Sequence, residues 1–110
     1  MNDFEEKKLM MQDIKLDERP REKLISRGRE ALELAEILAI IIGTGTTNFS
    51  ALDLSKEILK RFNNLNGYAS LKVEDLTEVN GIGKAKACQI IAALELARRL
   101  TGPSSLYEAE

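Results

Sequence analysis

The residues best suited to chemistry lie where two glycines flank one apolar residue and two lysines follow. The stretch reads Val79-Asn80-Gly81-Ile82-Gly83-Lys84-Ala85-Lys86. Glycine lets the backbone turn sharply and approach another surface closely. The apolar spacing on either side predicts a helix before the turn and another after it. We therefore expect the turn to join two helices, with Ile82 tucked between them.

The first N–H groups of the second helix are expected to form an anion site. They have no acceptor within their own helix, and they lie at the positive end of its dipole. Lys84 and Lys86 add positive charge beside them, and a phosphate diester is the ligand that fits best. Because backbone donors cannot distinguish bases, such a site would grip DNA without reading its sequence. The candidate phosphate-binding residues are Gly81, Ile82, Gly83, Lys84, Ala85 and Lys86.

The same glycine pair is also compatible with a purely structural role. A Gly-x-Gly turn between two helices can be no more than a tight connector, and alone it is a weak sign of binding. Here it combines with Val79 two positions before the first glycine, a lysine directly after the second, and an alanine-rich second helix. The combination favours DNA contact, and a structural hairpin stays the alternative.

Residues that would support catalysis or tight metal binding are scarce. Histidine is absent and Cys88 is the only cysteine, which excludes an internal disulfide and a zinc site of the Cys/His type. A reducing cytoplasm fits this usage. The commonest general base at neutral pH is also missing. Carboxylates and lysines form no spaced catalytic pattern, so we expect no transition-metal site, no cofactor beyond a monovalent cation considered below, and no enzymatic activity.

The charge balance argues against a strongly basic nucleic-acid binder. Lys and Arg number 16 against 18 Asp and Glu, which gives a net charge of -2. Any DNA affinity must come from a local site, and we expect it to be weak and salt-sensitive. One basic cluster interleaves with Glu18, Glu22 and Glu30, which favours a solvated, salt-bridged surface over a phosphate-binding patch. That cluster is Arg19, Arg21, Lys23, Arg27 and Arg29.

The elements that must position the turn are predicted to be helices. Hydrophobic residues make up 44% of the chain and aromatic residues only 5%, so the core must be aliphatic. Apolar residues recur at three- and four-residue steps over 31–42, 73–79 and 84–100, and from Ser50 up to Asn63. A short helix over 19–25 is expected from the residues at its ends. The expected fold class is all-α, a compact bundle of about five helices.

Local signals set the predicted helix ends and buried faces. Pro20 suits the first turn of the first helix, and Gly28 suits its end. Ser50 and Asp53 form a capping box at the start of the helix that follows residue 50. Lys72 is a poor cap for the helix that begins at Val73. The helix over 31–42 is expected to be buried on most sides. The predicted core faces are Leu34, Ile37, Leu38, Ile41 and Ile42; Leu52, Leu54, Ile58, Leu59 and Phe62; Val73, Leu76 and Val79; and Ala87, Ile90, Ile91, Leu94 and Ala97.

Three segments are expected along the chain. Residues 1–18 form an N-terminal arm, 19–101 the helical domain, and 102–110 a tail or linker. Two helix–glycine turn–helix units follow each other in the domain, one at Gly43-Thr44-Gly45 and one at Gly81-Ile82-Gly83. The acidic start lacks the apolar region of a signal peptide, and the longest apolar run, 37–42, is too short to span a bilayer. We expect no membrane association.

Residues 71–100 resemble the helix-hairpin-helix family, with the hairpin Val79-Asn80-Gly81-Ile82-Gly83 in its usual form. The resemblance implies that the N–H groups of Gly81, Gly83, Lys84 and Ala85 bind a DNA phosphate. Some members also hold a monovalent cation between hairpin carbonyls and phosphate. By position, those carbonyls would be Thr77, Val79 and Ile82.

A wider resemblance covers most of the chain. The segments 19–24, 30–32, 35–40, 44–46 and 81–87, in this order and spacing, resemble the N-terminal region of RadC-like DNA repair proteins. Gly43 stands where that family usually has Arg, and Leu34 where it has Asp or Asn. The absence of the Arg weakens any role of the first turn in phosphate contact and makes it look like a structural partner.

Full-length RadC-like proteins carry a following metal-dependent, peptidase-like domain with histidine ligands. We therefore expect this chain to be an N-terminal fragment to which that domain's catalysis cannot be assigned. The expected function is non-sequence-specific DNA binding through the phosphate backbone, in a repair-related protein. The alternative is a protein-interaction or dimerisation domain with a purely structural hairpin.

Overall fold

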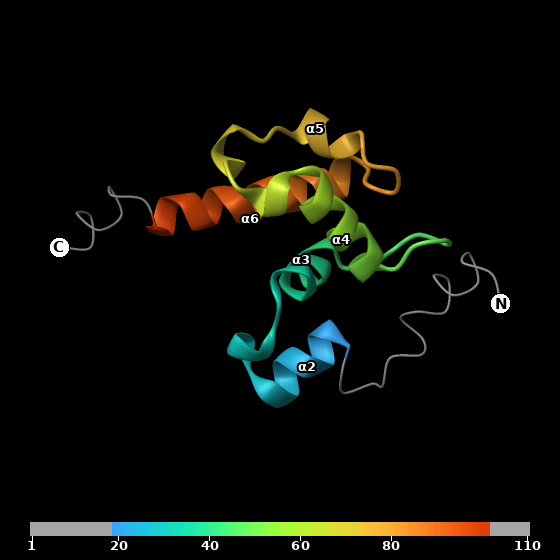
Figure 1. Cartoon of the computed structure of the whole chain (residues 1–110), viewed down its shortest axis with the longest axis vertical. Coiled ribbons are helices and arrows are strands. Elements are labelled where there is room, and N and C mark those ends of the chain that lie inside the picture. Colours follow the sequence, from blue (N-terminus) through green and yellow to red (C-terminus); the bar gives the residue numbers. More distant parts are fainter. Residues whose placement is uncertain (1–18, 102–110) are drawn as a thin grey trace.

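The computed structural model describes residues 19–101, so the predicted arm and tail lie outside the described residues. Within this range all regular structure is helical, which confirms the all-α prediction (Figure 1). The α-helices are α2 (Pro20–Arg27), α3 (Leu34–Ile42), α4 (Ala51–Arg61), α5 (Val73–Thr77) and α6 (Lys84–Thr101). Short 3-10 turns are η2 (Arg29–Ala31), η3 (Asn63–Leu65) and η4 (Tyr68–Ser70).

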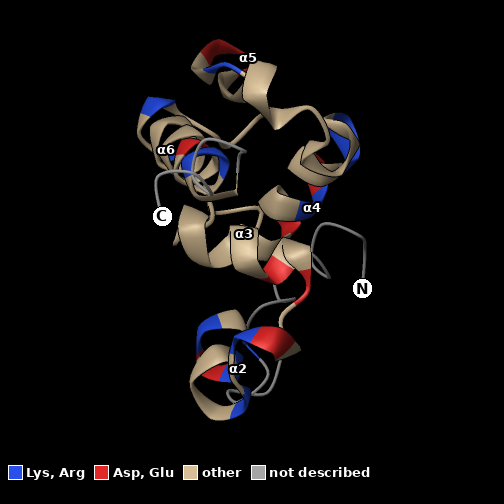
Figure 2. Cartoon of the chain, turned by 90° about the vertical axis from the view of Figure 1, so that its left-hand side faces the viewer, with Lys and Arg blue, Asp and Glu red and all other residues tan. Residues whose placement is uncertain are grey.

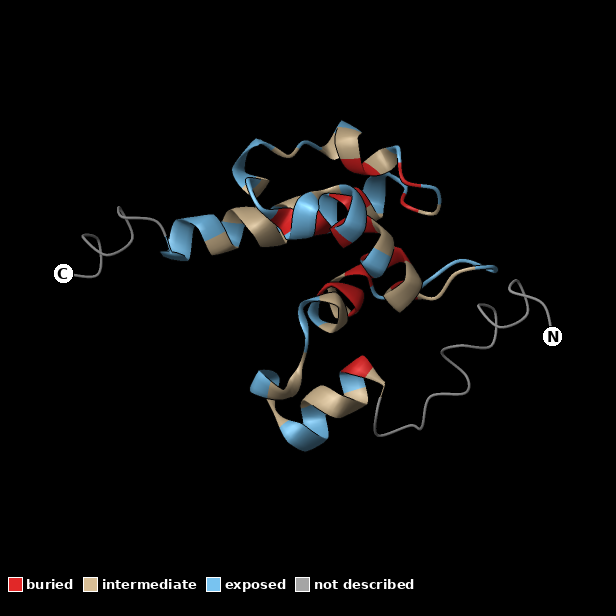
Figure 3. Ribbon diagram, in the orientation of Figure 1, coloured by how far each residue is buried: buried red, intermediate tan, exposed pale blue. Residues whose placement is uncertain are grey.

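One aliphatic core lies where α3, α4 and α6 meet. Buried residues gather there and at the α5–α6 turn, whereas α2 sits on the far side of α3 with only Pro20 buried (Figure 3). Ile58, Leu76 and Ile90 are completely excluded from solvent. Burying side chains of this size stabilises the fold by roughly 1.5–3 kcal/mol each. The packing of α6 against α3 and α5 is therefore what fixes the turn that precedes α6.

The start of α4 follows from its first residues. The Ser50 hydroxyl accepts the N–H of Asp53 at 3.0 Å, and the Asp53 carboxylate accepts the N–H of Ser50 at 3.1 Å. This is the predicted capping box, which satisfies two N–H groups that a helix start would otherwise leave unpaired. The helix then buries Leu54, Ile58 and Leu59, as its spacing predicts.

The start of α3 was predicted three residues too early. Residues Arg29–Ala31 form the separate turn η2, and α3 begins at Leu34. The Glu36 carboxylate accepts the N–H of Glu33 at 2.8 Å and so fixes the helix start there. Helical periodicity alone does not predict the break between η2 and α3, because the apolar spacing of the two segments is compatible with one continuous helix.

The burial of α3 was also overestimated. Its second half packs into the core through Leu38, Ala39 and Ile42, but Leu34 and Ile37 are 47% and 41% exposed. The physical reason is that α4 and α6 cover only one side of α3, and the short α2 covers little of the rest. An apolar helix is therefore left partly uncovered.

The basic cluster of α2 forms its ion pair with a different partner from the one expected. The Lys23 ammonium pairs with Glu36 of α3 at 3.2 Å, rather than with the neighbouring glutamates in sequence. Both side chains are largely buried, at 20% and 14% exposure. This pair attaches α2 to α3. Of the five basic residues of the predicted salt-bridged surface, only Lys23 forms an ion pair with another described residue, and that pair is a tertiary contact.

The helix before the candidate turn is shorter than predicted. α5 ends at Thr77, two residues before Val79. The N–H of Val79 bonds to the carbonyl of Leu76 at 3.0 Å, which tightens the last turn. Val79 is nevertheless buried, at 2% exposure, because the turn folds it back into the core. At the other end, Lys72 has no side-chain acceptor, and the Asp75 carboxylate caps its N–H at 2.9 Å.

The last helix follows its predicted pattern except at Ala97, which was expected on the buried face but is half-buried and lies outside the core. Ala87 and Ile90 are buried, and Ile91 and Leu94 pack against the core from the side. α6 ends at Thr101, whose hydroxyl donates to the carbonyl of Ala97 at 2.7 Å. Among residues 19–101, no helix combines the length and apolar character needed to cross a membrane.

Candidate nucleic-acid interface

The α5–α6 turn is held by a short series of backbone hydrogen bonds. The N–H of Ile82 bonds to the carbonyl of Val79 at 3.0 Å, and the N–H of Ala87 to the carbonyl of Gly83 at 3.0 Å. Ile82 is 3% exposed and belongs to the core. The prediction that Ile82 packs between the helices is confirmed. It anchors the turn and leaves the flanking backbone outside.

The two glycines of the turn serve different purposes. Gly81 has φ +99°, which L side chains rarely adopt. A Cβ there would also lie 2.8 Å from Cδ2 of Leu54 and 3.2 Å from Cγ2 of Thr46. The fold itself therefore requires glycine at position 81.

The fold makes no such demand at Gly83. Its φ is not in the left-handed range, and a Cβ there would meet nothing within 4 Å. Its carbonyl accepts the first bond of α6, so it occupies the N-cap position. Ser, Asp or Asn would cap this helix at least as well. A bare backbone at this exposed position leaves the start of α6 open to a ligand.

Four consecutive amides at the start of α6 lack an internal partner. Among the hydrogen bonds of residues 19–101, none uses the N–H of Gly83, Lys84, Ala85 or Lys86 as donor. The first three of these residues are exposed. α6 is 18 residues long, so its aligned peptide dipoles place partial positive charge here. The donors and the charge together suit an anion.

The two lysines beside these amides differ in surroundings. Lys84 is exposed, whereas Lys86 is half-buried and its ammonium lies 3.4 Å from the hydroxyl of Thr44. Thr44 belongs to the α3–α4 loop. Lys86 therefore reaches toward the first glycine turn, whereas Lys84 forms no ion pair with any residue in 19–101.

The first glycine turn is a longer loop than the second. It runs over residues 43–50, and the N–H of Thr46 bonds to the carbonyl of Phe49 at 2.7 Å. A Cβ on Gly45 would collide with the Phe49 carbonyl. The loop and the α5–α6 turn project from the same end of the molecule (Figure 1). The glycines of both turns can be recognised in the sequence, but the sequence does not predict that the two turns lie next to each other.

Contacts between the α3–α4 pair and the α5–α6 pair hold these turns side by side. Thr46 approaches the backbone at Gly81, as the Cβ distance above shows. The Gln89 amide donates to the carbonyl of Ile41 at 3.1 Å, which joins α6 to the end of α3. The first turn thus supports the second.

The three carbonyls considered for a monovalent cation lie around the turn but are not equivalent. Val79 O already accepts the Ile82 N–H. Within the described range, no backbone hydrogen bond outside the helices ends on the carbonyls of Thr77 or Ile82. Cation binding there stays a prediction.

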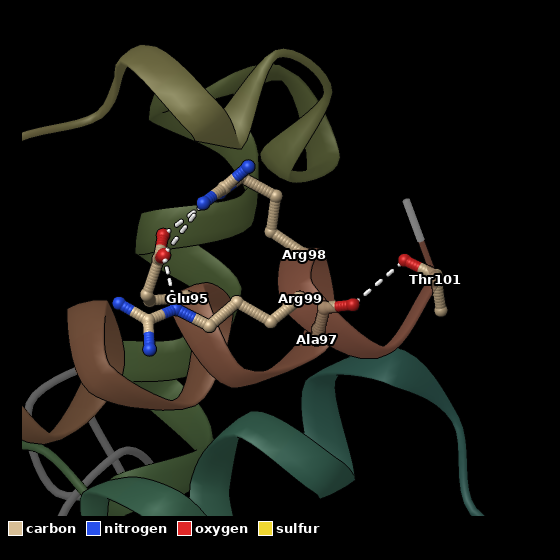
Figure 4. Close-up of polar contacts among 5 residues, drawn as sticks. All are labelled: Glu95, Ala97, Arg98, Arg99 and Thr101. Carbon is tan, nitrogen blue, oxygen red and sulfur yellow. Dashed lines mark hydrogen bonds and ion pairs between the residues drawn. The ribbon is translucent and has the colours of Figure 1, made fainter. Parts of the chain in front are cut away.

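Positive charge at the far end of α6 is partly offset by one carboxylate. Glu95 accepts two hydrogen bonds from Arg98, at 2.9 and 2.8 Å, and one from Arg99 at 2.8 Å (Figure 4). Arg98 first, and Arg99 after it, hold the pKa of Glu95 down to about 2. These arginines lie at the opposite end of the 18-residue α6 from the turn, so the turn must supply its own cations. Figure 2 shows basic residues on α2 with an acidic residue among them.

Groups that could hold a metal ion are absent from the described part of the chain. No cluster of three or more Cys, Asp or Glu side chains is present among residues 19–101. Cys88 is exposed on α6.

Similar proteins identify the family. The model of the UPF0758 N-terminal family matches residues 11–88. A UPF0758 protein of Flavobacterium johnsoniae is 52% identical over 83 residues, 76% of this chain and 36% of its own. Another from Geobacillus sp. (strain WCH70) is 45% identical over 92 residues, 84% and 41% of the two chains. A third, from Clostridium novyi, is 48% identical over 91 residues, which are 83% of this chain and 40% of the relative.

The chain spans well under half the length of these curated relatives. No solved structure matches it. Since the family model covers 11–88 of 110 residues, the chain belongs to the UPF0758 N-terminal family.

Proposed function

We propose that this chain is a DNA-binding module that grips the phosphate backbone without reading base sequence. The amides of Gly83, Lys84, Ala85 and Lys86 would donate to one phosphate, and the Lys84 ammonium would lie beside it. Lys86 would contribute at longer range. The observation that carries the proposal is the row of four unpaired amides at the start of an 18-residue helix, opened by a glycine that the fold does not require.

The family resemblance supports the same assignment. The turn over 79–83 is similar to the hairpin of helix-hairpin-helix proteins, in which such amides bind DNA phosphate. The RadC-like order of segments would place the module in a repair-related protein of the cytoplasm. The names of the relatives, all UPF0758 proteins, state no activity. The proposal assigns no catalysis to this chain.

The expected affinity is low. The chain has net charge -2, and its Arg98 and Arg99 are already paired with a carboxylate. Non-specific binders reach dissociation constants of roughly 1–100 µM at physiological salt. With few phosphate contacts, this module should lie at the weak end of that range or beyond it.

Titration of labelled duplex, single-stranded and branched DNA at low salt tests the proposal. The log of the binding constant should fall linearly with the log of salt concentration, with a slope of about 0.9 per duplex phosphate contacted. Lys84→Glu with Lys86→Glu should abolish binding. Absence of binding to every DNA form at about 1 mM, or full binding by the double variant, would refute it.

A protein-interaction or dimerisation role is the second candidate. Five large apolar side chains are exposed on α2, α3 and the last turns of α6: Ile25, Leu34, Ile37, Leu96 and Leu100. Contiguous exposed apolar surface marks interaction sites, and Leu34 and Ile37 lie one helical turn apart on α3. A molecular mass that rises with concentration in light scattering would support self-association. A strictly monomeric chain would count against dimerisation.

A further inference from the structure

A groove lies between α4 and the α5–α6 turn, next to the proposed phosphate site. Its volume is about 420 Å³, within the range of pockets that hold small organic groups. α4 supplies one wall through Lys56, Lys60 and Arg61, and Val79 and Asn80 supply the other. Phe49, from the loop before α4, and Asp53, Leu54 and Glu57 of α4 complete the lining.

The groove continues toward the amides. A second hollow of about 240 Å³ is lined by Thr46, Thr47 and Gly81, and it shares Phe49 and Asn80 with the first. Gly81 is two residues before Gly83, where the row of unpaired amides begins. The second hollow therefore adjoins the groove along α4 at Phe49 and Asn80, and it reaches within two residues of the first unpaired amide.

The charges that line the groove favour an anionic chain. Its two carboxylates are engaged, because Asp53 accepts the N–H of Ser50 and Glu57 pairs with Arg61 at 3.2 Å. Arg61 also donates to the carbonyl of Glu78 at 3.5 Å, which joins α4 to the turn. Lys56 and Lys60 are exposed, and neither forms an ion pair with another described residue. Three cationic side chains against two carboxylates leave the groove lining with a net charge of +1.

Phe49 adds an aromatic surface to this cationic path. Phe49 is half-buried, packs against the core and contributes to the lining of both hollows. Single-strand binders combine a positive groove that follows the backbone with aromatic rings on which bases stack. In an intact duplex, bases are stacked inside the helix and cannot offer a face to such a ring.

From these observations we infer that the groove takes an unpaired nucleotide of a single strand whose neighbouring phosphate is held at the start of α6. The inference rests on the proposed function and specifies the DNA form. The base would lie against Phe49, and the backbone would pass Lys56 and Lys60. The module would thus prefer single-stranded or frayed DNA to closed duplex.

The test compares binding of fluorescent single-stranded oligothymidylate with binding of a closed duplex hairpin, by anisotropy at low salt. Wild type should bind the single strand several-fold more tightly. Phe49→Leu keeps an apolar side chain in the loop but removes the ring. It should weaken single-strand binding roughly 5- to 100-fold, the range for loss of one base–aromatic stack, and leave duplex binding unchanged.

A second variant acts on solvent-facing residues, where folding is not at risk. Lys56→Gln with Lys60→Gln should lower single-strand affinity and reduce its salt slope by about 0.7 for each phosphate that the variant no longer binds. The matched control is Arg29→Gln with Lys72→Gln. It removes the same charge from exposed positions that do not line the groove. That control should leave single-strand binding close to wild type.

The outcomes separate the inference from the function on which it rests. Equal affinity for both DNA forms, or unchanged single-strand binding by Phe49→Leu, would overturn the groove assignment while DNA binding stood. Binding of a poly-glutamate peptide that oligothymidylate cannot displace would also overturn it, because the groove would then be a site for acidic protein segments. No binding to either DNA form would overturn both.

Discussion

Substituting the second glycine of the turn should separate DNA binding from stability. Gly83 is the N-cap of α6, and a side chain there meets nothing within 4 Å. Asp is a better N-cap than Gly by a few tenths of a kcal/mol, and its charge interacts favourably with the helix dipole by about 0.3–1 kcal/mol. Gly83→Asp should therefore raise the free energy of unfolding by roughly 0.3–1 kcal/mol.

The same change should remove DNA binding. The Asp carboxylate would accept the amides that a phosphate needs, and its negative charge would repel the phosphate. Hydrogen bonds to a charged group contribute about 1.5–3 kcal/mol, so affinity should fall at least about tenfold. Gly83→Asn is the matched control without charge. It should cap equally well and weaken binding less than Asp does.

The first glycine provides the contrast. Gly81→Ala would place a Cβ at φ +99° and 2.8 Å from Cδ2 of the buried Leu54. Backbone strain of this kind costs about 1–3 kcal/mol, and overpacking adds about 1–3 kcal/mol. The melting temperature should fall by roughly 10 °C or more.

Circular dichroism in urea and on heating measures stability, and anisotropy with labelled DNA measures binding. Wild-type DNA affinity in Gly83→Asp would refute the site, because the amides would then not be what holds the phosphate. A destabilised Gly83→Asp, or a Gly81→Ala as stable as wild type, would contradict the different roles of the two glycines.

Three further predictions concern the scaffold. Ile90→Ala should lower the free energy of unfolding by about 2–5 kcal/mol in urea denaturation, because Ile90 is fully buried; a decrease below about 1 kcal/mol would contradict its place in the core. Ser50→Ala should cost about 0.5–2 kcal/mol by the same assay, since it removes the acceptor for the Asp53 N–H. In a carboxyl NMR titration, Glu95 should show a pKa of about 2, and Arg98→Gln should move it up toward 4.5. The pKa of Glu95 is lower in the folded state than in the unfolded state. The small stabilisation of the fold by Glu95 and its arginines is therefore present above pH 4.5 and is lost as pH falls toward 2. An ordinary pKa for Glu95 in the wild type would show that the arginines do not hold the carboxylate in solution.

Local rules were enough to predict much of the fold. Ser50 with Asp53 marked the start of α4, and Ile82 was correctly placed between two helices, because capping and apolar spacing act over a few residues. The exposure of Leu34 and Ile37 was missed, because it depends on how much of α3 its neighbours cover. This coverage depends on the tertiary arrangement of the helices, and apolar periodicity does not predict it.

The candidate site was predicted in outline, and its internal differences were not. The sequence treats Gly81 and Gly83 alike, yet only Gly81 has positive φ and faces a core side chain. The difference depends on Leu54 and Thr46, which are far away in sequence. The groove beside Phe49 was equally hidden, since it exists only where the loop before α4 meets the α5–α6 turn.

Amide chemical shifts of the ¹⁵N-labelled chain, followed during titration with a short DNA at low salt, test the proposed phosphate site most directly. We predict that the largest shifts fall on the N–H groups of residues 81–86. We also predict that these shifts saturate together and disappear as salt is raised. Shifts centred on α2 or on the last turns of α6, with residues 83–86 unmoved, would contradict DNA binding through the start of α6.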